Sequence, residues 1–154
     1  MTTFTSRKPV RDKLAQLHRD SGAWSNVYSG MPNFKKIAGD SPICFVLSGG
    51  TDTKFENANT NPREHDFVIT TMVLYAVRTT IEDGWTYIDA EDLLDSLEQK
   101  SAQIIRDNAD GAGVASLFRF EGASEIRRGE IINRNFNYTV EMRTVTARLN
   151  RGAL

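Results

Sequence analysis

The sequence predicts an α+β domain, in which a β-sheet is packed by an N-terminal helix and a central amphipathic helix. The sheet is indicated by residues 65–77, HDFVITTMVLYAV, where apolar side chains occupy both alternating positions of a strand. A strand with one face in water shows a single apolar face, so both faces of this strand are expected to be covered. The central helix is indicated by residues 89–108, where apolar side chains recur at helical spacing. A length of 154 residues fits a single domain, 1–154.

Composition and charge exclude several classes of protein. Hydrophobic residues at 40% and charged residues at 25% are typical of soluble globular proteins, and the net charge of −1 gives no polyanion-binding signal. The single cysteine, Cys44, excludes an internal disulfide and a multi-thiolate metal site. Residues 65–77 are too short to span a membrane, and the start, MTTFTSRKPV, lacks the apolar core of a secretory signal. The chain is therefore expected to be made in the cytoplasm.

The N-terminal helix is expected over residues 7–19. Pro9 suits a first helical turn, where its missing N–H costs nothing, and Gly22 is a suitable end. Three apolar residues recur on one helical face: Val10, Leu14 and Leu17.

The segment before the long strand is predicted to be mostly irregular. Residues 23–42 contain several glycines and prolines, which interrupt regular structure. A short strand is expected over 43–47, ended by Gly49 and Gly50. The polar stretch near 49–65 is too long for a tight hairpin. Loops of this length are usually functional or mobile.

A capping signal precedes the central helix. Asp89 is the expected N-cap, Asp92 stands at the capping-box position, and Glu91 adds negative charge at the positive end of the helix dipole. The helix carries one long stripe: Leu93, Leu94, Leu97, Ser101, Ile104 and Ile105. We expect this stripe to cover one face of the long strand, and the N-terminal helix to supply the remaining cover.

Three more strands are expected over residues 114–120, 125–132 and 136–149. In the last strand, the apolar residues change phase partway, which predicts a β-bulge or bend near Arg143 and Thr144. Six arginines make this part of the chain basic: Arg127, Arg128, Arg134, Arg143, Arg148 and Arg151. They fit either the charged solvent face of an edge strand or a row at a subunit interface.

Residues suited to catalysis are scarce. His18 is expected at the surface or as a helix cap, and Cys44 as a small buried side chain. We predict no enzyme, no metal site and no cofactor. A rival hypothesis is a hydrolase or metal-dependent nuclease that uses Glu64, His65, Asp66 and Asp89. Aromatic residues of the irregular stretches either fold back on the core or anchor a partner: Trp24, Tyr28, Phe34, Trp85 and Tyr87.

The order of these elements resembles that of the tail terminator (tail completion) proteins of tailed bacteriophages. MPNFKKIAGDSPICFVLSGGTD looks like the family's first-strand region, and REHDFVITTMVLYAV looks like its second strand. DAEDLLDSLEQKSAQIIRDN looks like its principal helix, and NFNYTVEMRTVTARL looks like its closing strand. The chain differs from the family in having a longer N-terminal segment and a basic C-terminal extension. These differences leave open a role as another neck or head–tail connector subunit.

The resemblance implies a small domain with a mixed or mainly antiparallel sheet and packed helices. It implies a homohexameric ring in the virion tail or neck that caps the tail tube, ends its polymerisation and offers a surface for head attachment. The implied partners are other copies of the chain, the tail tube protein, a neck or head–tail connector protein and, in a contractile tail, the sheath protein. DNA would pass through the lumen without being read. A small non-enzymatic adaptor module is the other alternative.

By analogy of position with the tail terminator proteins, we expect interface residues in three groups. The first group lies in the polar loop: Thr53, Lys54, Glu56, Arg63 and Glu64. The second precedes the central helix and the third closes the chain: Trp85 and Tyr87, then Arg143, Arg148 and Arg151.

Overall fold

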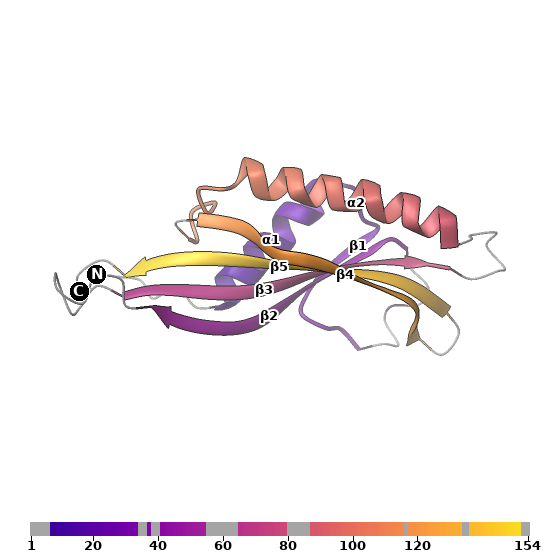
Figure 1. Ribbon diagram of the computed structural model, residues 1–154, viewed down its shortest axis with the longest axis horizontal. Helices are drawn as coiled ribbons and strands as arrows, with labels where there is room; N and C mark the ends of the chain where they lie inside the picture. Colours follow the sequence, from indigo (N-terminus) through magenta and orange to yellow (C-terminus); the bar gives the residue numbers. More distant parts are fainter. Residues whose placement is uncertain are drawn as a thin grey trace.

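The computed structural model describes residues 7–33, 37, 41–54, 65–79, 87–115, 117–133 and 136–151. Within these ranges the elements follow in this order: α1 (Arg7–Asp20), β1 (Asn26–Ser29), β2 (Ile43–Lys54), β3 (His65–Arg78), α2 (Tyr87–Asp107), β4 (Leu117–Asn133) and β5 (Phe136–Arg151). The strands form one sheet in the order β1-β2-β3-β5-β4 (Figure 1). β1 and β2 are parallel, and the other neighbours are antiparallel. The predicted α+β class with a mixed, mainly antiparallel sheet is confirmed.

Both helices lie on the same face of the sheet (Figure 1). α1 packs over β1 and β2, and α2 packs over β3, β5 and β4. The main core fills the space between the helices and the sheet, and its fully buried members include Val10, Leu14, Cys44, Val73, Tyr75 and Leu94. The expectation that α1 covers the face left open by α2 is therefore wrong.

The second apolar phase of β3 is covered by a different part of the chain. Leu74 and Ala76 belong to a smaller cluster on the face opposite the helices, because successive side chains of a strand point to opposite faces. The fully buried Ile37, from the segment between β1 and β2, belongs to this cluster. Its other main members come from the neighbouring strands: Ile43, Phe45 and Tyr138.

β2 does not end at Gly49 and Gly50 as predicted, but continues to Lys54. Its register with β3 shifts between Ser48 and Thr51, which places the two glycines in an irregularity of the ladder. A Cβ atom on Gly49 would lie 2.9 Å from the Thr70 carbonyl oxygen, so the backbones approach more closely here than a side chain allows. The first part of the predicted polar loop is thus strand, and residues 55–64 lie outside the described residues.

Three other boundaries differ from the sequence prediction. Asn26–Ser29 form β1 within the stretch predicted to be irregular, because they pair in parallel with the start of β2. α2 begins at Tyr87, so Asp89 lies in its first turn and is not the N-cap. β4 is a single strand where two were predicted.

The irregularity expected in the closing strand lies in its neighbour. β5 keeps one continuous register with β3, so the prediction of a bulge in β5 is wrong. In β4, Glu121 pairs with Thr144 and Glu125 pairs with Met142, which leaves extra β4 residues opposite Arg143. The disruption therefore occurs at the expected place along the sheet but on the edge strand, where bulges are common.

The apolar side chains of β5 change phase because opposite faces of this regular strand are buried at its two ends. Tyr138 and Val140 pack in the cluster on the face away from the helices. Val145 and Ala147 pack in the main core beneath the helices. A strand buried on alternate faces at its two ends shows two apolar phases without any slip in register.

Candidate interface site

Three of the predicted interface residues lie together at one end of the sheet. Thr53 and Lys54 end β2, and Arg151 ends β5. Both strand ends flank the start of β3, where Lys54 pairs with Asp66 and Arg151 pairs with His65. These positions therefore lie on the two strands that flank β3, at the left end of the sheet in Figure 1. We call this set, Thr53, Lys54 and Arg151, the strand-end group.

The remaining loop positions do not all join this group. Glu56, Arg63, Glu64 and Trp85 lie outside the described residues. Tyr87 is the first residue of α2, which begins at the end of the sheet opposite the strand-end group (Figure 1). The predicted residues thus belong to at least two separate regions of the molecule.

Arg143 contacts other parts of the same chain. Its guanidinium donates a 3.3 Å hydrogen bond to Glu98 on α2 and lies 4.3 Å from the centre of the Phe120 ring on β4. Only 17% of the side chain is exposed. Cation–π and ion-pair contacts to two elements favour a role in holding α2 on the sheet. The sequence carries no local signal for this role, because its partners are distant along the chain.

A buried carboxylate accompanies Arg143. Glu141 is 3% exposed. It stands two residues before Arg143 in β5, so its side chain lies on the same face of the sheet, the face that α2 covers. Burial raises the pKa of Glu141, and the nearby Glu98 and Asp95 carboxylates raise it further, whereas Ser124 and Arg143 lower it. The carboxylates of α2 therefore act on the pKa of a buried group of β5.

Arg148 lies on β5 between Val68 of β3 and Leu117 of β4. It alternates with Ala147 and Leu149, which pack in the main core, so its side chain belongs to the face away from the helices. It is half-buried. Of the three C-terminal candidates, Arg148 thus lies on the sheet face and Arg151 in the strand-end group.

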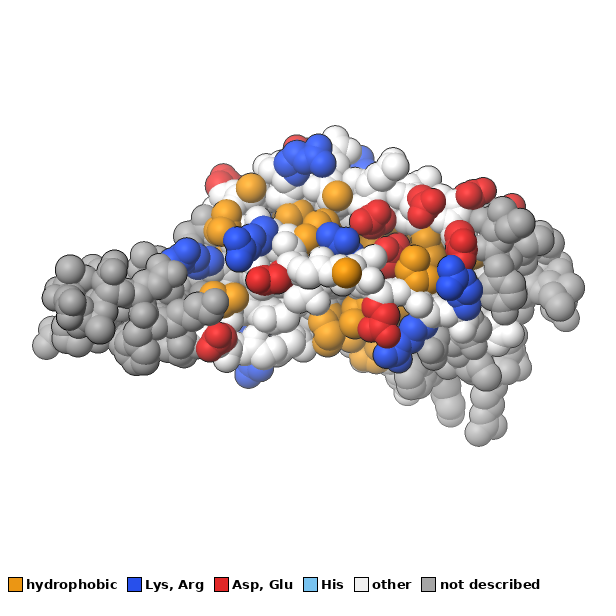
Figure 2. All heavy atoms as spheres, in the orientation of Figure 1, with side chains coloured by type: hydrophobic (Ala, Val, Ile, Leu, Met, Phe, Trp, Pro, Cys, Tyr) orange, Lys and Arg blue, Asp and Glu red, His pale blue; other side chains and the backbone are white. Residues whose placement is uncertain are grey.

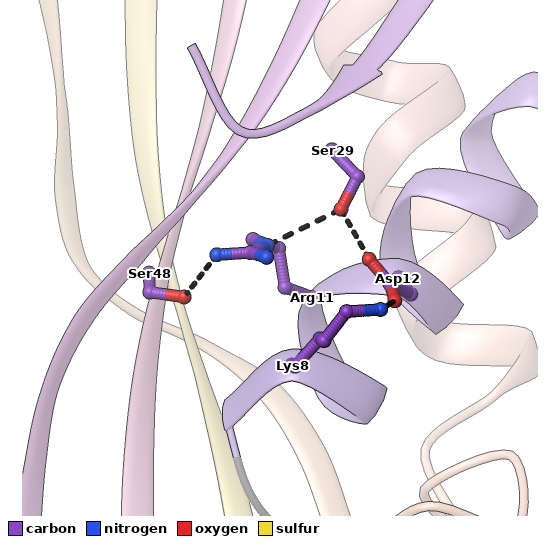
Figure 3. A network of polar contacts seen from close by, with 5 residues as sticks. All are labelled: Lys8, Arg11, Asp12, Ser29 and Ser48. Carbon is purple, nitrogen blue, oxygen red and sulfur yellow. Dashed lines mark hydrogen bonds and ion pairs between the residues drawn. The ribbon is translucent and has the colours of Figure 1, made fainter.

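Sequence reasoning missed a polar network that fastens α1 to β1 and β2 (Figure 3). Arg11 donates hydrogen bonds of 3.2 Å to the hydroxyls of Ser29 and Ser48. The Ser29 hydroxyl donates to Asp12, which also pairs with Lys8. Hydrogen bonds from Lys8 and then Ser29 lower the pKa of the Asp12 carboxyl. The Lys8–Asp12 pair has helical i,i+4 spacing, but the serines could not be found without the fold.

His18 was expected at the surface or as a helix cap, and the surface position is wrong, because the residue is fully buried. Its Nδ1–H donates to the Leu14 carbonyl at 2.7 Å, so Nε2 accepts from the Ser101 hydroxyl at 2.8 Å. The ring also packs against Trp24, with the ring centroids 5.2 Å apart. Burial lowers the pKa of His18 to about 4, so the imidazole is neutral at pH 7.

The residues of the hydrolase hypothesis are divided between two ends of the fold. His65 and Asp66 begin β3, whereas Asp89 lies in the first turn of α2, beyond the other end of that strand. A 14-residue strand spans about 40 Å. Within the described ranges, no three His, Cys, Asp or Glu side chains are grouped so that they could hold a metal ion.

Comparison of the sequence with protein-family models and with curated proteins found no match. Among the described helices, none has the length and apolar character needed to cross a membrane.

Proposed function

We propose that this chain is a structural virion subunit that forms a six-fold ring, caps the tail tube, ends tube polymerisation and provides the head–tail attachment surface. The single observation that carries the proposal is the order of its elements. The order is a helix, three strands, a second helix and two closing strands. The strands form a mixed, mainly antiparallel sheet, and both helices pack on it. This is the architecture that the resemblance to tail terminator proteins implies.

The strand-end group supports a docking role at one end of the domain. Its positions stand on the two strands that are hydrogen-bonded to either side of β3, which fixes their backbones relative to one another. Binding residues carried by a rigid scaffold lose little entropy when a partner docks. The near-neutral chain also suits a ring through which DNA slides, because a strongly basic lumen would hold phosphates.

Reversing two charges of the strand-end group tests the docking role. We expect the Lys54→Glu/Arg151→Glu variant to bind the ends of tail tubes about tenfold more weakly than the unchanged chain. The measurement is tube length by electron microscopy, with purified tube protein polymerising in the presence of each variant. The unchanged chain should give tubes of limited length, and the variant should give longer ones.

The matched control is Lys13→Glu/Lys100→Glu, which makes the same change in net charge on α1 and α2. This control should limit tube length as the unchanged chain does. Equal tube lengths with and without the unchanged chain would contradict the capping function and favour a connector or adaptor role. Capping by all three proteins would exclude the strand-end group as the docking surface.

A further inference from the structure

The two helices carry opposite net charge. α1 has five Lys or Arg residues against two Asp or Glu, whereas α2 has six Asp or Glu against two Lys or Arg. The strands beneath them offset only part of this difference. β1 has no charged residue and β4 has three arginines and three glutamates, whereas β5, beneath α2, has three arginines against one glutamate. The charge separation of the domain therefore follows the helices.

The positive charge lies along the β1–β2 edge of the sheet. Three α1 guanidiniums bind there to neutral acceptors: Arg7 to the Gly49 carbonyl, Arg11 to Ser29 and Ser48, and Arg19 to the Val27 carbonyl. These neutral acceptors hold the arginines in place without cancelling their charge, and Arg11 also has a carboxylate nearby, that of Asp12, which accepts from the same Ser29 hydroxyl. Arg7 and Arg19 are exposed, so the charge reaches solvent at this edge. We call Arg7, Arg11 and Arg19 the basic edge.

The negative charge lies on the opposite side, over β4 and β5. Glu91 pairs with Arg128 of β4, and Glu98 pairs with Arg143 of β5, so this side of α2 faces that edge. Asp95 stands four residues after Glu91 and three before Glu98, which places it on the same side of the helix. Asp92 and Asp95 are both exposed. Figure 2 shows acidic side chains gathered over α2. We call Glu91, Asp92, Asp95 and Glu98 the acidic edge.

These two edges are at opposite sides of the sheet, since β1 and β4 are its outer strands. Two copies that met edge to edge across a two-fold axis would place basic edge against basic edge or acidic against acidic, and like charges in contact cost several kcal/mol. A head-to-tail arrangement places the basic edge of one copy beside the acidic edge of the next. Such contacts close into a ring when the rotation from one copy to the next closes, as the proposed six-fold ring requires.

We propose that the basic edge of α1 in one subunit binds the acidic edge of α2 in the next subunit of the ring. This inference rests on the proposed function and specifies which surfaces meet within its ring. The contact is made by side chains of the helical layer. A continuous backbone ladder through β4 is disfavoured, because three register irregularities and alternating charges blunt that edge.

Charge reversal within one chain tests the contact. Arg19→Glu and Asp95→Lys should each raise the concentration needed for half-maximal ring formation about tenfold, measured by light scattering at low ionic strength. The double variant Arg19→Glu/Asp95→Lys restores opposite charges at every interface and should assemble within about threefold of the unchanged chain.

The matched controls are Lys13→Glu, on the side of α1 turned away from Arg11 and Arg19, and Asp107→Lys, at the last residue of α2. Each changes net charge as its edge counterpart does and should leave assembly within about threefold of the unchanged chain. Circular dichroism checks that every variant keeps its fold.

Carbodiimide cross-linking of the unchanged chain gives an independent measurement. It joins amines to carboxylates in direct contact, so mixed ¹⁵N-labelled and unlabelled copies should yield cross-links from Lys8 to Asp92 or Asp95 between chains. Rings that form equally well with Arg19→Glu and Asp95→Lys, and give no such cross-links, would overturn this contact and leave the ring function standing. An unchanged chain that never assembles, alone or on tail tubes, would overturn both.

Discussion

Lowering the pH from 6.5 to 4 is expected to remove about 3 kcal/mol from the free energy of unfolding through His18 alone. The ordinary pKa of a histidine is 6.5, and burial lowers that of His18 to about 4 in the folded chain. Between these values the unfolded chain binds a proton that the folded chain does not. The stabilising contribution is therefore complete above pH 6.5, falls as the pH drops, and is lost by pH 4.

The measurement is urea unfolding at half-unit steps from pH 7 to pH 4, compared with His18→Gln. This variant keeps a side-chain amide that can bond Ser101 and Leu14 but does not titrate. Subtracting its curve removes the contributions of other titrating groups, including Glu141, whose raised pKa acts in the opposite direction. Parallel curves for the two proteins would contradict the account of His18 as a neutral, buried imidazole.

Gly111→Ala is expected to destabilise the fold by about 3 kcal/mol. Gly111 follows α2 and has a φ of +87°, in the left-handed region that favours glycine. A Cβ atom there would lie 2.1 Å from the Ala115 carbonyl oxygen, so the backbone itself must move. The turn also depends on the Gly111 carbonyl, which accepts hydrogen bonds from the amides of Val114 and Ala115.

Gly113→Ala provides the matched control two residues along the chain. Gly113 has a similar φ of +84°, but a Cβ atom there meets nothing within 4 Å. Its substitution should cost only the left-handed backbone penalty, about 1 kcal/mol. Urea unfolding of both variants separates the two effects. Equal losses of stability would show that the contact with Ala115 does not restrict Gly111.

Local patterns predicted the fold class well, because they report which residues are buried. The double apolar phase of β3 and the stripe of α2 identified a covered strand and its covering helix. Periodicity does not say which element provides the cover, however. For this reason α1 was assigned to the wrong face, and the role of Ile37 was not foreseen. The sequence around Gly49 predicts a strand end, because a glycine in a bulge and a glycine in a turn look alike in sequence.

Which residues of the candidate site lie together could not be predicted from the sequence, because their positions depend on strand pairing. Lys54 and Arg151 are far apart in the chain, and only the register with β3 brings them to one end of the sheet. Arg143 belonged to a basic run in the sequence, yet its contacts with Glu98 and Phe120 turn it inward. The position of His18 near a helix end predicts a surface or cap role, because its contacts with Ser101 and Trp24 depend on the fold.

The central claim is that copies of this chain form a ring. Light scattering of the purified protein, followed by negative-stain imaging of the same peak, tests it most directly. We expect the mass of six copies of the 17.3 kDa chain and images with six-fold symmetry, either in solution or once tail tubes are added. The mass of a single chain, unchanged by tail tubes and with no ring in the images, would contradict it.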